Sequence, residues 1–185
     1  MRLLDAVPDL FQAIELLLKE RLELANPRGL GDQPNNPTVL ERLADAGVAL
    51  APDEAELVSR LRRLRNDLQH SSARFNHRAT LALCRSALIF IDRFVEDELH
   101  AWVGDIIAPD AWHQLLAIEE IRARAMRVVG GRLQPYREDP EATITTCARC
   151  SAETMVRPHP NTGASCVLCG HIPVQKDYGQ GLRSK

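Results

Sequence analysis

The chain has few aromatic residues, almost no excess charge of either sign and no long apolar run. Aromatic residues make up 4% of its 185 residues, and 23 basic side chains stand against 25 acidic ones, for a net charge of −2. Proteins that coat nucleic acid or membranes through bulk electrostatics need a strongly basic balance, so that class is excluded. No apolar run approaches the roughly 18 residues of a spanning helix, and the N-terminus lacks the layout of a signal peptide. We therefore expect a cytoplasmic protein with no membrane partner.

Disulfides are also not expected, because the chain has only five cysteines and no export signal. Cys84 stands alone in an apolar stretch and is interpreted as a small core residue. The other four form two C-x-x-C pairs with fifteen residues between them: Cys147, Cys150, Cys166 and Cys169. This spacing is typical of two knuckles that hold one zinc ion tetrahedrally.

The segment around these cysteines resembles a zinc ribbon, with a β-hairpin over residues 151–165 between the knuckles. Gly170 supplies the permissive conformation that the chain needs just after the second knuckle. His159 and His171 lie nearby, but four cysteines already close the coordination shell, so one Zn²⁺ per chain is expected to be structural. The segment has few apolar residues, so zinc should supply its folding free energy.

Helical periodicity dominates the first 130 residues. Apolar residues recur at spacings of three and four in five segments, at about 3–25, 38–46, 53–70, 77–103 and 109–129. Pro8 is expected to kink or delay the first helix, Thr38 and Asp53 to cap the second and third, and Gly130-Gly131 to end the fifth. The fold class predicted is all-α, a bundle of about five helices followed by a small β zinc-ribbon module. The predicted domains are a bundle over residues 1–131, a linker over 132–143, and a ribbon with a tail over 144–185.

The charge is unevenly distributed along the chain. Residues 1–56 carry 5 basic and 11 acidic side chains, whereas residues 57–85 carry 7 basic ones and a single acid, Asp67. Residues 57–85 are therefore a basic island between acidic segments.

A helical wheel sorts the residues of the third predicted helix. Its buried stripe is predicted to be Leu57, Leu61, Leu64 and Leu68. Relative to Leu57, Asn66 falls near ~180° and His70 near ~220°, so both point away from the core, while Arg65 flanks the stripe near ~80°. One interpretation is a solvated arginine face, with a histidine that interacts with the helix dipole. The other is a site in which a histidine moves protons and an arginine stabilises phosphate charge.

The string Leu64-Arg65-Asn66-Asp67-Leu68-Gln69-His70 resembles the signature of the HEPN superfamily, an arginine and a polar residue followed by a histidine. Its place at the end of a mid-bundle helix matches as well, and the resemblance covers roughly residues 1–130. It implies a homodimer in which two motif helices form one cleft, and a metal-independent endoribonuclease. His70 would assist proton transfer as the ribose 2′-hydroxyl attacks, Arg65 would stabilise the phosphorane, and Asn66 would orient the phosphate or His70.

The resemblance has limits. Some toxin members carry an aromatic residue two positions after the histidine, where this chain has Ser72. Other members have lost activity and serve as sensors or scaffolds. Arg74, Asn76, His77 and Arg78 follow the motif and would either line the cleft or form a polar interhelical loop.

Three functions remain open. The first is an HEPN-type ribonuclease with RNA as substrate, in a toxin–antitoxin or antiviral role that includes a protein antitoxin or other partner; this role rests on family analogy alone. The second is a non-catalytic dimerisation or adaptor protein whose ribbon binds nucleic acid or a protein. Arg149, Arg157 and Lys176 suit a phosphate backbone or ordinary ribbon surface equally well. A transcription regulator is weaker, because no helix-turn-helix is evident.

Overall fold

The computed structural model describes residues 3–27, 36–70 and 75–173. Within these ranges the protein is mostly helical, with seven helices followed by a small three-stranded antiparallel sheet. Its contacts divide it into two compact units, Met1–Asp105 and Ile106–Lys185, and each is described by itself.

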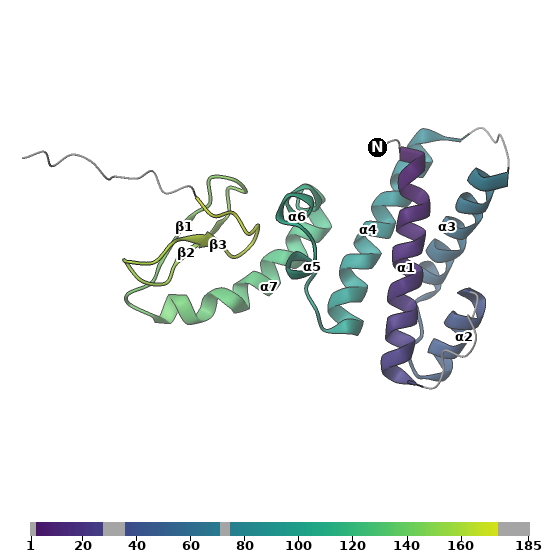
Figure 1. Cartoon of the computed structure of the whole chain (residues 1–185), viewed down its shortest axis with the longest axis horizontal. Helices are drawn as coiled ribbons and strands as arrows, with labels where there is room; N and C mark the ends of the chain where they lie inside the picture. The colour runs from purple at the N-terminus through teal and green to yellow at the C-terminus, as the bar shows by residue number, and fades with distance from the viewer. Residues whose placement is uncertain (1–2, 28–35, 71–74, 174–185) are drawn as a thin grey trace, which may run out of the picture. The chain divides into compact units, whose positions relative to one another are not determined.

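Four helices form the first unit, and the first of them contacts the other three (Figure 1). In chain order they are α1 (Leu3–Ala25), α2 (Asn36–Asp45), α3 (Pro52–His70) and α4 (His77–Leu99). Apolar residues at helical spacing face inward and form one core, which includes Ile14, Leu18, Leu43, Leu61 and Phe94. This core fixes the position of α3, the helix that carries the predicted motif.

The ends of these helices follow local chemistry, with some differences from the prediction. Pro8 lies inside α1, which nevertheless begins at Leu3. The cap predicted at Asp53 is wrong, since α3 already begins at Pro52 and the Glu54 carboxylate accepts a hydrogen bond from the Ala51 N–H at 2.9 Å. The Asn76 side chain caps α4 by accepting from the Ala79 N–H at 3.1 Å. Each of these two hydrogen bonds satisfies a backbone N–H at a helix start that has no partner within the helix.

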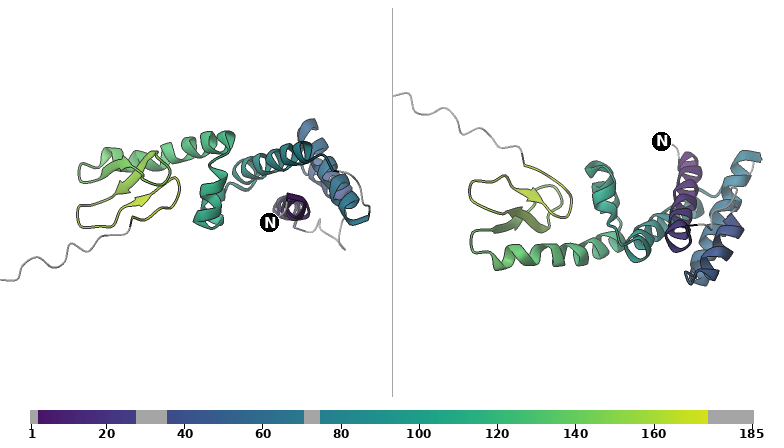
Figure 2. Two further views of the ribbon diagram at one scale, coloured as in Figure 1. Left: turned by 90° about the horizontal axis from the view of Figure 1, so that it is seen from above. Right: turned by 60° about the horizontal axis from the view of Figure 1, so that its bottom comes forward.

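The second unit contains two further helices and the sheet. They are α6 (Pro109–Leu115), α7 (Glu119–Glu138), β1 (Thr143–Thr146), β2 (Glu153–Arg157) and β3 (Ser165–Cys166), while the short α5 (Val103–Ile106) spans the boundary between the units. The strand order is β1-β2-β3 with both pairs antiparallel, and a register shift falls between Thr145 and Thr146. Figure 2 shows α7 alongside the sheet, and α7 contacts β1 and β2.

Three predictions about this unit need correction. The helix expected over 109–129 is two helices, interrupted at residues 116–118. Gly130-Gly131 does not end the last helix, and much of the predicted 132–143 linker is helical, because α7 continues to Glu138 through Pro135. The buried residues Ile121, Ala125, Val129 and Leu133 repeat every four positions. This continuous buried stripe outweighs a helix penalty of about 1 kcal/mol for each glycine.

The division between units also differs from the one expected near residue 131. It falls at residues 105 and 106, because α7 contacts β1 and β2 and because Trp112 of α6 is hydrogen-bonded to Leu168. The β-hairpin expected over 151–165 matches β2 and β3, whereas β1 was not predicted.

Candidate functional site

Four cysteine sulfurs meet at one place in the second unit. The Sγ atoms of Cys147, Cys150, Cys166 and Cys169 lie within 4.8 Å of one another, and all four residues are buried. The Sγ–Sγ separation is 3.7 Å for Cys147–Cys169 and 3.7 Å for Cys150–Cys166. Metal–sulfur bonds of about 2.3 Å in a tetrahedron place the sulfurs roughly 3.8 Å apart. The cluster can therefore hold one metal ion, such as zinc, with protein ligands in all four positions.

Two backbone turns of the same geometry present these sulfurs. After the first pair, the Ser151 N–H donates to the Cys147 carbonyl at 2.9 Å; after the second, the Gly170 N–H donates to the Cys166 carbonyl at 2.9 Å. Both residues have left-handed backbone, with φ of +58° for Ser151 and +67° for Gly170. The predicted role of Gly170 is confirmed, and Ser151 takes the same conformation at the matching position of the first turn.

Backbone donors also approach the sulfurs. The Arg149 N–H donates to Cys147 Sγ at 3.4 Å, and the Cys169 N–H donates to Cys166 Sγ at 3.3 Å. Thr154, which is fully buried on β2, places its hydroxyl 3.1 Å from Cys166 Sγ. The two backbone N–H donors stabilise thiolates, the form that binds metal, and all three contacts fix the orientation of the ligands. The contact of Thr154 with the cysteines was not predicted. A polar residue on a predicted strand next to a C-x-x-C pair was the sequence feature that could have indicated it.

Burial acts differently on the individual thiols. Desolvation raises the pKa of Cys150 and of Cys169 above the ordinary thiol value. Burial also acts to raise the pKa of Cys147, but backbone hydrogen bonds from Cys150 and Arg149 outweigh it and leave that pKa lowered. A metal ion entering the cluster would therefore displace protons from at least two buried thiols.

Helices α6 and α7 are attached directly to the knuckles. The indole Nε1 of Trp112 donates to the Leu168 carbonyl at 2.7 Å, and both residues are almost completely buried. Arg122 on α7 donates to the Cys150 carbonyl at 3.2 Å, and Arg149 forms an ion pair with Asp110 at 2.5 Å. These contacts were not predicted, because they join residues 28 to 56 positions apart in the sequence.

The predicted motif lies on the last two turns of α3. Asn66 is exposed, as the wheel predicted, and Arg65 is half-buried with its guanidinium carbon 5.4 Å from the centre of the Phe11 ring. Arg65 Nη1 also donates to the Asn66 side-chain oxygen at 3.2 Å. His70 is the final residue of α3, and its side chain lies outside the described part of the structure.

The core face of α3 is slightly rotated from the predicted stripe. Val58 and Leu61 are its buried residues, while Leu57, Leu64 and Leu68 are half-buried against the core. Arg65 faces α1 through Phe11, about 140° around the helix from position 70 at ~100° per residue. One chain therefore brings Arg65 and Asn66 together and places Arg65 on a different side of α3 from position 70.

Comparison with protein-family models, curated proteins and solved structures finds no significant match for this chain. The HEPN resemblance consequently rests on the motif and the helical layout alone. No helix in the described ranges combines the length and apolar character needed to cross a membrane.

Proposed function

We propose that this protein is a metal-independent endoribonuclease whose helical unit cuts RNA and whose C-terminal unit carries one structural Zn²⁺. The observation that carries the catalytic part is the arrangement of Arg65, which is held over Phe11 and hydrogen-bonded to Asn66 one turn before His70. A guanidinium fixed in this way is pre-organised to stabilise charge on a phosphate.

The reaction follows from the chemistry of these side chains. His70 accepts the proton of the ribose 2′-hydroxyl, and the 2′-oxygen attacks the adjacent phosphorus. Arg65 stabilises the added negative charge while the bond to the 5′-oxygen breaks, and that oxygen takes up a proton. The products are a 2′,3′-cyclic phosphate and a 5′-hydroxyl end. DNA lacks the nucleophile and should not be cut.

The proposed site requires a homodimer. Arg65 and position 70 lie on different sides of α3 in one chain, so a second motif helix is needed to complete a cleft around one phosphate. The basic island of residues 57–85 would then adjoin its counterpart and concentrate positive potential there. A toxin–antitoxin or antiviral role, with a neutralising protein partner, remains part of this proposal through the family resemblance only.

The choice of zinc rests on the ligands. Four thiolates suit a soft or borderline ion, and zinc is the usual occupant of closed tetrahedral cysteine sites. Native mass spectrometry is expected to find about one zinc per chain. A folded C-terminal unit without metal would contradict this assignment.

The test of catalysis uses zinc-loaded full-length protein, mixed RNA and excess EDTA, with zinc retention checked by mass spectrometry. Cleavage is expected to persist in EDTA, to disappear in His70→Ala and Arg65→Ala, and to recover poorly in Arg65→Lys, since lysine lacks the planar fork. Arg62→Ala is the matched control, because it removes an α3 arginine outside the motif. Dimer content is measured for every variant.

The second candidate is the non-catalytic adaptor. It is favoured by the same contacts of Arg65, because an arginine engaged with Phe11 and Asn66 also suits a purely structural role. Wild-type protein that is dimeric, zinc-loaded and inert on structured and unstructured RNA would establish the adaptor and refute the ribonuclease.

A further inference from the structure

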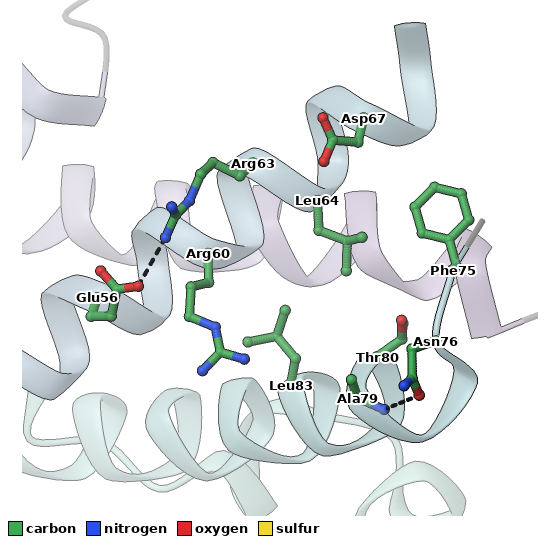
Figure 3. A pocket seen from close by; sticks show the side chains of 10 residues that line it. All are labelled: Glu56, Arg60, Arg63, Leu64, Asp67, Phe75, Asn76, Ala79, Thr80 and Leu83. Atoms are coloured by element: carbon green, nitrogen blue, oxygen red, sulfur yellow. Dashed lines mark hydrogen bonds and ion pairs between the residues drawn. The ribbon is translucent and has the colours of Figure 1, made fainter. Parts of the chain in front are cut away.

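A groove of about 520 Å³ lies between α3 and the start of α4, within the first unit (Figure 3). Its floor is apolar and includes Leu64 from α3 and Leu83 from α4. Its volume falls in the range of small-molecule sites and accommodates one nucleotide. None of its lining residues belongs to the Arg65-Asn66 pair, so it is a separate feature of the same helix.

One end of the groove is cationic. Arg60 is exposed and extends from α3 toward α4, as Figure 3 shows, and no ion pair of Arg60 is found among the described residues. Arg63 lies one turn further along and pairs with Glu56 at 2.8 Å, with both side chains more than half exposed. An exposed pair of this kind is weak, so a phosphate can replace the Glu56 carboxylate.

The other end carries an aromatic ring and polar groups. Phe75 is half-buried at the wall, and Asn76 uses its side-chain oxygen to cap α4, which leaves its amide N–H groups for other partners. Thr80 also lines the groove and is only 4% exposed. Its hydroxyl can both donate and accept a hydrogen bond, so a ligand in the groove can bind to it.

We propose that this groove binds one nucleotide of single-stranded RNA, with the base against Phe75 and the phosphate on Arg60 and Arg63. Asn76 and Thr80 hydrogen-bond the base or ribose. Stacking on an aromatic ring, together with a cation for the backbone, is how proteins hold unpaired bases. This inference rests on the proposed function, for which it supplies a substrate-positioning site.

The surrounding charges set the direction of the strand. The hollow on the other side of Arg60 is lined by three carboxylates, those of Asp53, Glu54 and Glu56. Its one further arginine, Arg93, is already paired with Glu54, so a polyanion is not expected to continue there. In the opposite direction α3 continues past Asp67, which lines the groove, to His70, three residues later. The bound nucleotide would therefore lie next to the phosphate that His70 acts on.

Binding is tested separately from cleavage by fluorescence anisotropy on the full-length zinc-loaded protein. The probe is a labelled, mixed-sequence single-stranded RNA of about 12 nucleotides with 2′-O-methyl riboses, which cannot be cut. Arg60→Ala should weaken binding about tenfold and lower the salt dependence by roughly 0.7 in log–log slope. Thr80→Val, which keeps the shape of the side chain and removes the hydroxyl, should weaken it about threefold.

A substitution that is expected to strengthen binding and a matched control complete the test. Glu56→Gln removes the carboxylate that competes for Arg63, so it should tighten binding about threefold. Arg127→Ala removes the same charge from an exposed position on α7, outside both the groove and the basic island, and should leave the affinity unchanged. Thermal melting confirms that each variant is folded.

Each outcome decides one of the two proposals. Groove effects of the expected sign without cleavage of ordinary RNA support the nucleotide site and refute the ribonuclease. RNA cleavage with Arg60→Ala and Thr80→Val both binding like wild type overturns the nucleotide site and leaves the ribonuclease standing. Wild-type protein that does not bind the probe also overturns the nucleotide site.

Discussion

Removal of the metal is expected to unfold the C-terminal unit and release Trp112. The indole of Trp112 is 1% exposed and is held by the Leu168 carbonyl, which lies between Cys166 and Cys169. The position of this carbonyl depends on the conformation of the second knuckle, which we expect a bound metal to hold in place. A chelator that removes the ion should therefore expose an indole on α6.

The distances give the size of the effect. Two thiolates 3.7 Å apart repel by about 4–5 kcal/mol at an effective dielectric of about 20, so the metal-free cluster must protonate or open. Structural zinc sites contribute roughly 10–16 kcal/mol of apparent binding free energy, comparable to the whole stability of a typical domain, about 5–15 kcal/mol. The unit is therefore not expected to remain folded without metal.

The assay is tryptophan emission in a Trp102→Phe background, because the chain has only two tryptophans and Trp112 is then the sole emitter. Chelation should shift the emission to the red, and added zinc should restore it. Cys169→Ser should behave like the chelated protein. The matched control is Cys84→Ala, which removes the one cysteine outside the cluster and should leave the zinc-dependent signal intact.

One result would refute this reasoning. If the zinc-free protein, verified by mass spectrometry, keeps the emission of a buried Trp112 and slow amide exchange in α7, the metal does not hold the unit together. The packing of α6 and α7 on the sheet would then be sufficient for folding.

Three further predictions concern the C-terminal unit. Trp112→Phe leaves its buried carbonyl partner without a donor and should lower the free energy of unfolding by about 1–3 kcal/mol in thermal melts of the zinc-loaded protein; an unchanged melting temperature would contradict this. Gly170→Ala forces an alanine into φ +67° and should cost about 1–2 kcal/mol in the same measurement, whereas Gly163→Ala, in open space without positive φ, should cost less. Because burial raises the pKa of Cys150 and Cys169, their thiols are neutral without metal and must lose protons to bind it; zinc affinity, measured by competition with a chromogenic chelator, should fall as pH decreases below 7, and a flat profile would be inconsistent.

Periodicity and turn chemistry predicted much of the fold. Apolar residues at spacings of three and four located α1, α3 and the start of α4 closely, because burying one face of a helix requires that spacing. The predicted end of α4 near residue 103 is wrong, since the helix ends at Leu99 and His100 has left-handed backbone. Gly47 ends the α2 segment with φ +82°, as a glycine after a helix suggests. The prediction failed at Gly130-Gly131 and Pro135, where local propensity favours an end but a buried stripe continues the helix.

The candidate sites were predicted to different extents. The four cysteines were identified together because ligand spacing reflects the geometry of one metal ion. The roles of Thr154 and Trp112 were not predicted, since their contacts with the knuckles depend on how distant segments pack. For the motif, the wheel placed Asn66 on the exposed face, but only the packing of α1 on α3 shows Arg65 against Phe11.

By itself, the sequence determined the helical character of the chain, the cysteine cluster and the concentration of positive charge over residues 57–85. These features depend on residue type and spacing within short segments. The tertiary structure decided that α6 and α7 belong with the sheet, that Arg65 packs against Phe11 of α1, and that Arg60, Phe75 and Thr80 line one groove. Such arrangements depend on which buried surfaces meet, and sequence spacing carries little information about contacts between distant segments.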